Sequence, residues 1–340
     1  MKKALFVPGD LGACGYYRML QFQRLMQMSY GEVLPMYLGP LNLVNAHQDV
    51  TVVQRIVSRE SLKFLVEHRK ETGSKVIMDY DDLLWLPKNG SLHKYNCFLN
   101  RLPTEEAAKA LAELLDDAAD LVTVSCDALK AEVERFVPSD KVKVIPNYLT
   151  LNDWWFDQTK EIPNDDTFFY AGSLSHYDNE KKLHGDFSIP LANYLKDKMT
   201  MFMGDQPPWF FEKCVMQIPW VSISTYSKAL YNNTRYAKFT MAPIESNVFN
   251  TCKSDLKYLE SCAIGRVCLV SDFTGSPYEN AHPMQKIPQN ASIGQIKDIV
   301  EDCKKHYGEI LDYQYNYLNT RWTDSHVDEY ANMILEVANG

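Results

Sequence analysis

The stretch that decides the fold runs from residue 250 to residue 265 and reads Asn-Thr-Cys-Lys-Ser-Asp-Leu-Lys-Tyr-Leu-Glu-Ser-Cys-Ala-Ile-Gly. Within it, Leu256, Leu259 and Ala263 recur at helical spacing, which predicts a single helix with one buried face. Gly265 suits the end of this helix, because glycine readily adopts the left-handed conformation that terminates helices. An apolar run follows at once and predicts a buried strand.

This helix carries a lysine and a glutamate on one face. Lys253 and Glu260 are seven residues apart, about two turns, so they lie roughly 10 Å apart along the helix axis. A helix start at Asn250 or Thr251, with Lys253 and Ser254 beside it, suits a diphosphate. A carboxylate two turns further on suits a pair of sugar hydroxyls. The pattern fits a nucleotide-sugar site, and the alternative is a solvated helix face, which is common in α/β proteins.

Strands and helices alternate on both sides of this stretch. Such alternation indicates parallel sheets covered by helices, so we expect an α/β fold of two Rossmann-like doubly wound domains with a cleft between them. The acidic segment 150–166 breaks the alternation and reads as a linker. The predicted domains are an N-terminal acceptor domain, a C-terminal donor domain and a final helix that can cross back to the first domain, at 1–150, 151–320 and 321–340. The predicted strands lie at 3–7, 50–53, 75–78, 121–124, 142–145, 167–170, 199–203, 221–223, 239–242 and 267–270.

A glycine-containing loop follows the first predicted strand. Residues 9–15 read Gly-Asp-Leu-Gly-Ala-Cys-Gly, which is not the G-x-G-x-x-G dinucleotide pattern. Gly12 and Gly15 still let the backbone approach a ligand at the carboxyl end of that strand. Arg18, one turn into the predicted helix 16–28, is placed to reach the same crevice, the alternative being an ordinary surface arginine.

Three carboxylates follow the predicted strand 75–78. Asp79, Asp81 and Asp82 could bind a divalent metal or provide a general base. The alternative is a helix start, where aspartate is favoured by the helix dipole.

A small-residue turn follows the first strand of the second half. Gly172 and Ser173 would offer backbone N–H groups to an anion there. His176, three residues further on, is a candidate base.

Composition narrows the class of protein. The chain has 340 residues, 46% of them hydrophobic, and a net charge of −9, which argues against a uniformly basic nucleic-acid binder. Its eight cysteines form no C-x-x-C pair, and its sequence contains no apolar run of membrane-spanning length. These features predict a cytoplasmic protein with reduced cysteines and no membrane segment. They leave the oligomeric state open.

Together these segments resemble the GT-B glycosyltransferases, specifically the family 4-like group. The run F-N-x-x-K-S-x-x-K-x-x-E at 249–260 is the most specific part of the match. The resemblance implies transfer of a sugar from a nucleotide diphosphate sugar, most simply UDP-linked, with retention at the anomeric carbon. It implies no obligatory cofactor or divalent metal, although the aspartates are compatible with one. The segments that carry the resemblance are 12–18, 78–85, 119–125, 145–147, 170–176, 242–243 and 249–271.

The resemblance also assigns roles to residues. Lys253 and Ser254 would hold the diphosphate, and Glu260 the ribose. Arg18 could help to stabilise the charge of the departing diphosphate. Gly172 and Ser173 would line the phosphate turn, and Gly12 and Gly15 would lie beside donor or acceptor. The base candidates are Asp79, Asp81 and His176.

One position departs from the family. Its paired glutamates are eight residues apart, but the position eight before Glu260 is Cys252. The contacts that the first glutamate makes to the transferred sugar are therefore missing. Glu245, in the preceding loop, could replace it.

The sequence says less about the acceptor. Its compact length and its Gly-Tyr-Tyr-Arg-Met opening at 15–19 resemble bacteriophage glycosyltransferases, so the acceptor expected is 5-hydroxymethylcytosine in phage DNA. The alternative acceptors are a surface glycan and a lipid-linked sugar. Two other classes remain open: a nucleotide-sugar epimerase or phosphorylase-like enzyme, and a non-catalytic GT-B binding protein.

Overall fold

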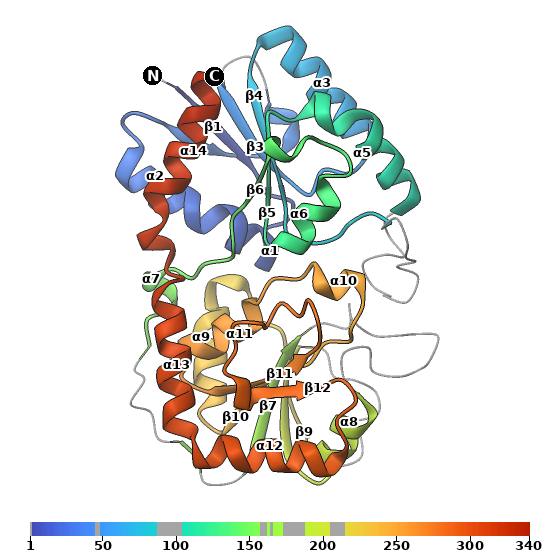
Figure 1. Ribbon diagram of the computed structural model, residues 1–340. Coiled ribbons are helices and arrows are strands. Elements are labelled where there is room, and N and C mark those ends of the chain that lie inside the picture. Colours follow the sequence, from blue (N-terminus) through green and yellow to red (C-terminus); the bar gives the residue numbers. More distant parts are fainter. Residues whose placement is uncertain are drawn as a thin grey trace.

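Two parallel six-stranded sheets form the framework of the protein in a computed structural model (Figure 1). In the first sheet the strand order is β2-β1-β3-β4-β5-β6, and in the second it is β12-β11-β10-β7-β8-β9. Neighbouring strands pair in parallel in both sheets. The expected α/β class with two doubly wound sheets is confirmed. The structure describes residues 2–44, 48–86, 104–156, 162–163, 166–172, 188–204 and 215–340.

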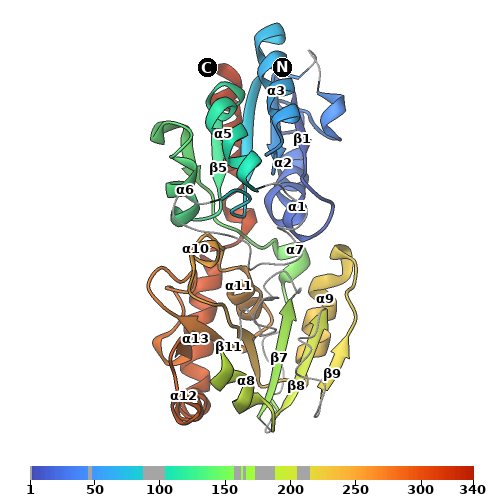
Figure 2. The same ribbon diagram turned by 90° about the vertical axis from the view of Figure 1, so that its right-hand side faces the viewer.

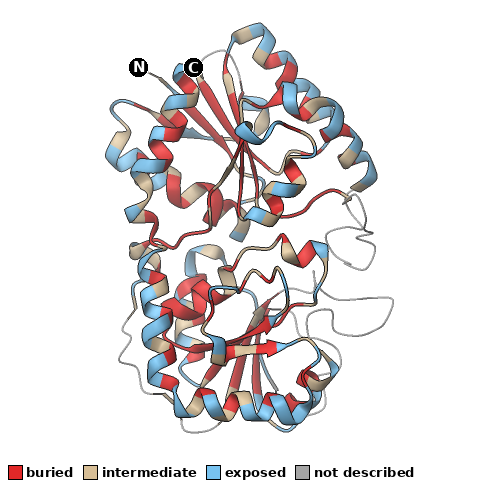
Figure 3. Cartoon of the chain, in the orientation of Figure 1, coloured by how far each residue is buried: buried red, intermediate tan, exposed pale blue. Residues whose placement is uncertain are grey.

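Each sheet is built from one half of the chain, and its central strands are buried on both faces (Figure 3). The first sheet comprises β1 (Ala4–Val7), β2 (Met36–Leu38), β3 (Val50–Gln54), β4 (Lys75–Tyr80), β5 (Leu121–Val124) and β6 (Val142–Val144). The second comprises β7 (Thr167–Gly172), β8 (Met199–Gly204), β9 (Val215–Ile218), β10 (Phe239–Ala242), β11 (Val267–Asp272) and β12 (Lys286–Pro288).

Helices cover both faces of each sheet, as parallel sheets require. In the first half they are α1 (Ala13–Gly15), the π-helical segment η1 (Tyr16–Leu20), α2 (Gln21–Tyr30), α3 (Arg59–Thr72), α5 (Thr104–Ala118), α6 (Asp127–Val133) and α7 (Leu151–Trp154). In the second half they are α8 (Ile189–Leu195), α9 (Ile223–Thr234), α10 (Val248–Thr251), α11 (Leu256–Ala263), α12 (Ile293–Lys305), α13 (Tyr307–Asn319) and α14 (Val327–Asn339). Short 3₁₀ turns are η2 (Leu41–Leu43), η3 (Ser139–Lys141), η6 (Pro283–Gln285) and η7 (Thr323–Ser325).

The last helix leaves the second sheet and packs on the first. Figure 1 shows α14 beside α2, on the face of the first sheet opposite α3 and α5, and the rotated view of Figure 2 places both chain ends at this end of the molecule. Tyr330 of α14 stacks on Phe22 of α2, with their ring centroids 4.4 Å apart. Ile334 is fully buried in the same apolar cluster. The apolar face of α14 therefore ties the C-terminus to the first half of the chain.

The sequence prediction lacked two short edge strands and misplaced one other strand. β2 and β12 are three residues long, too short for a recognisable alternation of apolar and polar residues. The prediction of a strand at 221–223 is wrong, because β9 lies at Val215–Ile218 and Ile223 already begins α9. Val221 and Ile223, from the segment where the strand was expected, instead line the space between the sheets.

Candidate functional site

The largest change to the prediction concerns the stretch 250–265 itself. It does not form one helix: α10 ends at Thr251, and α11 begins only at Leu256. Asn247, not Asn250, caps the first helix, its side chain accepting a hydrogen bond from the Asn250 N–H. The expected end is confirmed, because Gly265 has φ 67° in the left-handed region. Lys253 and Ser254 thus lie in the break between two helices, where their side chains are free to point away from the sheet.

This break opens onto a cavity of about 430 Å³ between the two sheets. The cavity is lined from the first half of the chain by the glycine-containing loop and by the carboxyl ends of β3 and β4, and from the second half by α9, α11 and the end of β7. The carboxyl ends of parallel strands are where doubly wound proteins bind ligands. The structure brings Gly12, Arg18, Asp81, Gly172, Lys253, Ser254 and Glu260 together around this one cavity.

Lys253 reaches across the cavity to the first half of the chain. Its Nζ lies 2.8 Å from Oδ1 and 3.0 Å from Oδ2 of Asp82. The same ammonium lies 4.3 Å from the centroid of the Phe249 ring. Both partners are mostly shielded, with side chains 20% and 13% exposed, so this pair is screened less than a surface salt bridge.

Ser254 is also met from across the cavity. The Asn147 Nδ2 donates a hydrogen bond of 2.8 Å to the Ser254 Oγ. Asn147 is itself held by Arg18, whose Nη1 donates to the Asn147 Oδ1 at 3.2 Å and to the Ile145 carbonyl. Arg18 is only 2% exposed, so it forms part of the cavity wall and positions Asn147 more than it reaches into the crevice.

Glu260 lines the cavity and is 5% exposed. The Tyr17 hydroxyl donates to its Oε1 at 2.7 Å, and the Tyr226 hydroxyl donates to its Oε2 at 3.2 Å. Burial raises the pKa of Glu260 to about 7, against the opposing effect of the two tyrosine hydrogen bonds. A carboxylate with two hydroxyl donors already in place can equally accept two hydroxyls from a ligand.

The glycine-containing loop binds its own aspartate. The Asp10 Oδ1 accepts hydrogen bonds from the Gly12 N–H at 2.7 Å and the Gly15 N–H at 3.2 Å. Gly12 lines the cavity, whereas Gly15 lies beneath the loop, where a Cβ would meet the Asp10 carbonyl oxygen at 1.8 Å. Gly15, the last residue of α1, therefore allows the helix to approach the loop closely and is not among the residues that line the cavity.

Asp79 is not placed as a base. It belongs to β4 itself, because the strand runs two residues further than predicted, and its side chain is 1% exposed. Its Oδ2 accepts a hydrogen bond from Arg18 at 2.7 Å and one from the Thr123 hydroxyl at 2.8 Å. Asp79 holds Arg18 in the wall of the cavity and does not line the cavity itself.

Asp81 does line the cavity, paired with an arginine that the sequence prediction missed. The Arg55 Nε and Nη2 donate to the two Asp81 carboxylate oxygens at 2.5 and 2.9 Å. Burial alone would raise the pKa of Asp81, but Arg55 lowers it below its usual range. A carboxylate whose pKa is lowered in this way stays ionised at neutral pH and is a weak base.

Arg55 has an unusual backbone as well as this pairing. Its φ of 61° places a non-glycine residue in the left-handed region, a strained conformation that clusters at ligand sites. It directly follows β3, just as the aspartates follow β4, so its position after a buried strand was the signal available in the sequence.

Two further residues of the cavity come from the second half of the chain. Lys257, one turn after Lys253, donates from its Nζ to the Tyr170 hydroxyl at 2.9 Å. Trp220 is 47% exposed and lies against Gly204, where a Cβ would meet its ring at 2.3 Å. The repeat of lysine at i and i+4 could have indicated Lys257, whereas Trp220 follows β9, the strand that the sequence prediction misplaced.

Several predicted residues lie elsewhere. Ser173 and His176 fall outside the described residues. Cys252 is 1% exposed and packs with Phe249 in the apolar cluster of the first sheet, where burial raises its thiol pKa. Neither Cys252 nor Glu245 is among the described residues that line the cavity. The position that departs from the family pattern therefore packs between the two halves and does not face the ligand space.

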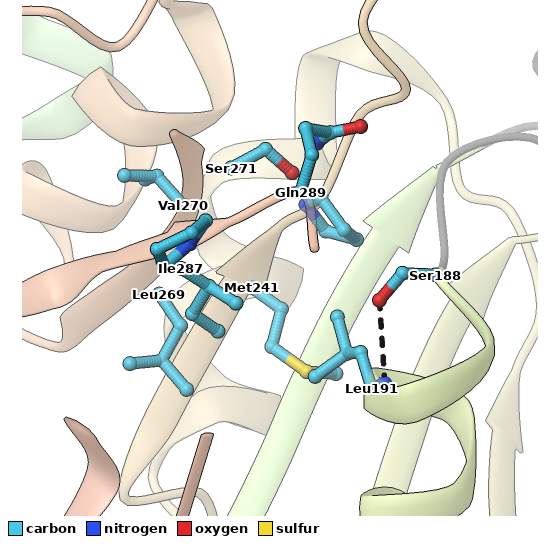
Figure 4. Close-up of a pocket in the computed structure, with 10 residues that line it drawn as sticks. Ser188, Leu191, Met241, Leu269, Val270, Ser271, Ile287 and Gln289 are labelled. Carbon is cyan, nitrogen blue, oxygen red and sulfur yellow. Dashed lines mark hydrogen bonds between the residues drawn. The ribbon is translucent and has the colours of Figure 1, made fainter. Parts of the chain in front are cut away.

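Another depression lies outside this cavity. A depression beside β11 and α8, lined by Ser188, Met241 and Gln289 among others, encloses only about 10 Å³, the space of one water molecule (Figure 4). Within the described part of the chain, three or more histidine, cysteine or acidic side chains are nowhere gathered as a metal site.

The same described residues include no helix of sufficient length and apolarity to cross a bilayer.

Comparisons with known proteins identify the fold. No family model matches the sequence, and no curated protein matches it. The chain is similar to solved structures along nearly its whole length. HepE of Anabaena in complex with UDP-glucose is 10% identical, with a TM-score of 0.67 over 99% of this chain and 100% of HepE.

Two further structures give the same picture. An α,α-trehalose-phosphate synthase (UDP-forming) from Burkholderia xenovorans is 10% identical, with a TM-score of 0.55 over 94% of this chain and 78% of that one. S. aureus TarM, as a mutant in complex with UDP and other ligands, is 10% identical, with a TM-score of 0.56 over 87% and 56% of the respective chains. The two parallel doubly wound sheets, the cavity between them and these likenesses together show that the chain has the GT-B fold.

Proposed function

We propose that the protein is a glycosyltransferase that transfers a sugar from a UDP-sugar to an acceptor hydroxyl. One observation carries the proposal: Lys253, Ser254 and Glu260 line a single cavity between two sheets of GT-B arrangement. The structural neighbour HepE, solved with UDP-glucose, supports the same donor class.

The cavity offers a group for each part of such a donor. Lys253 and Lys257 supply positive charge for the diphosphate, beside the first turn of α11, where the helix dipole favours an anion. Glu260 accepts the ribose hydroxyls. The exposed ring of Trp220 provides a flat apolar surface for the nucleobase.

These groups also suit the chemistry of transfer. When the bond between the sugar and the diphosphate breaks, negative charge grows on the β-phosphate, and the fixed charge of Lys253 stabilises it. We propose that transfer needs no obligatory divalent metal, because the Lys253 ammonium and the start of α11 meet the leaving group. We also propose that transfer proceeds with retention at the anomeric carbon. Asp81 is the described base candidate that faces the cavity.

We further propose that residues 1–150 bind the acceptor, that residues 151–320 bind the donor, and that 321–340 tie the two together. The packing of α14 on α2 supports the last assignment. Domain closure over the donor would then exclude water and limit hydrolysis.

Calorimetry with UDP and UDP-glucose tests the donor assignment, and a product assay tests the reaction. We expect binding in the micromolar range and label transfer at equal rates with Mg²⁺ and with EDTA. Binding without any product, with every acceptor tested, would favour the non-catalytic binding protein. Conversion of the donor alone into another nucleotide-sugar would indicate an epimerase.

The acceptor stays a prediction with two candidates. The sequence suggests 5-hydroxymethylcytosine in bacteriophage DNA. The first-domain wall of the cavity, however, carries Asp81 and Asp82 against Arg55, so among its described residues it presents no surplus positive charge to DNA phosphates. This charge balance favours the alternative, the neutral hydroxyl of a surface glycan or a lipid-linked sugar. Labelled UDP-sugars offered to hydroxymethylated DNA and to glycans in parallel distinguish the candidates.

Donor affinity is expected to depend on pH through Glu260. With a pKa of about 7 this carboxyl is protonated at lower pH, and only its ionised form accepts both ribose hydroxyls. The ionised fraction falls from about 0.9 at pH 8 to about 0.1 at pH 6. The Kd for UDP-glucose, whose diphosphate diester keeps its charge over this range, should therefore rise about tenfold.

Calorimetry at three pH values measures this rise, with Glu260→Gln as the matched control. The variant is expected to bind more weakly and with a Kd independent of pH. An equal pH dependence in the variant would assign the titration to another group.

A further inference from the structure

Three side chains of the proposed donor site are each bound by a side chain from the opposite half of the chain. Asp82 holds Lys253, Asn147 donates to Ser254 and Tyr17 donates to Glu260, over distances of 2.8, 2.8 and 2.7 Å. Tyr17 and Asn147 come from the first domain, as does Asp82. These contacts join the two domains across the cavity.

The contacts have the chemistry of the donor. A carboxylate in front of Lys253 stands where a diphosphate oxygen would bind, and a phenol hydroxyl on Glu260 stands where a ribose hydroxyl would bind. A donor whose diphosphate and ribose occupy those positions would displace Asp82 and Tyr17.

Asp82 has a second cation within reach. Its Oδ2 lies 3.4 Å from the Arg55 Nη2, on its own side of the cavity. Arg55 is anchored by the bidentate pair with Asp81, so it stays in place when Asp82 moves. Asp82 thus lies between two cations, Arg55 of the first domain and Lys253 of the second.

Resting on the function proposed above, we propose that Asp82 is an internal competitor of the donor diphosphate. In the unliganded enzyme it binds Lys253 and holds the two domains together. When the donor arrives, the diphosphate takes Lys253, and Asp82 keeps its contact with Arg55. Donor binding therefore leaves Asp82 paired with Arg55 and does not create an unpaired buried carboxylate, which would be costly.

The substitution Asp82→Asn tests the proposal, because it keeps the shape of the side chain and removes its charge. Competition for Lys253 is lost, so the Kd for UDP-glucose is expected to fall by about fivefold or more. The unliganded variant is also expected to be more open, with a larger radius of gyration by small-angle X-ray scattering. This second measurement needs no donor.

A double-mutant cycle separates competition from simple charge repulsion. If Asp82 acts through Lys253, Asp82→Asn should change the Kd little in a Lys253→Met background. If it merely repels the diphosphate, the gain in affinity should be the same in both backgrounds, and the proposal is overturned.

The outcomes also separate this proposal from the proposed function. A wild-type protein that binds UDP-glucose, with an unchanged Kd and radius of gyration in Asp82→Asn, overturns the competitor role alone. A wild-type protein that binds neither UDP nor any UDP-sugar overturns the proposed function and, with it, the competitor role.

Discussion

Replacing Lys253 by methionine is expected to weaken the binding of UDP-glucose by about a hundredfold or more. Methionine keeps the length of the side chain but removes the ammonium that faces the diphosphate, a charge-assisted contact in a partly buried position. Isothermal titration with UDP-glucose measures the effect, and the rate of transfer should fall in parallel.

A lysine outside the cavity provides the control. Lys304, on α12, pairs with Asp166 and Glu301 and does not line the cavity. Lys304→Met removes the same charge from the chain and is expected to leave the Kd unchanged. Equal Kd values for wild type and Lys253→Met would remove Lys253 from the donor site.

The second large effect concerns stability. Asp79→Asn is expected to lower the free energy of unfolding by about 3–5 kcal/mol, because it leaves the Arg18 guanidinium buried without its counter-charge. Arg18 and Asp79 are 2% and 1% exposed, and Asp79 does not line the cavity. The loss should appear as a lower midpoint of urea denaturation.

Two variants show whether the loss comes from the unpaired charge. The double substitution Arg18→Met with Asp79→Leu removes both charges and should recover most of the stability. Arg59→Gln breaks the exposed Arg59–Glu113 pair, 46% and 54% exposed, and should leave the midpoint unchanged. A midpoint for Asp79→Asn close to that of the wild type would show that the buried pair contributes little.

Elements with a clear hydrophobic period were predicted well. The strands at Leu121–Val124 and Phe239–Ala242 have the expected bounds. Their burial is local and periodic, so it is visible in sequence. The prediction of one helix running through Lys253 was wrong, because four polar or small residues separate α10 from α11. The period of the apolar residues does not reveal this break.

Pairings between distant residues were not predictable. Arg55 and Asp82 are 27 residues apart, and Asp82 and Lys253 are 171 apart, so no local pattern connects them. The sequence placed Asp79, Asp81 and Asp82 together, but the partners Arg18, Arg55 and Lys253 come from three separate segments. Only those partners distinguish a structural carboxylate from one that faces the cavity.

The sequence by itself determined the two α/β halves and the residue types of the proposed donor site, since strand and helix periodicity and the Lys-Ser-to-Glu spacing are properties of the local chain. The tertiary structure alone decided that Cys252 packs inside the domain interface and that Arg18 is buried and paired with Asp79. It also decided that Lys253, Ser254 and Glu260 are each bound by a side chain from the opposite half. The physical reason is that hydrophobic period is set by neighbours in sequence, whereas the pairing of charges and hydroxyls is set by which segments the two sheets bring face to face.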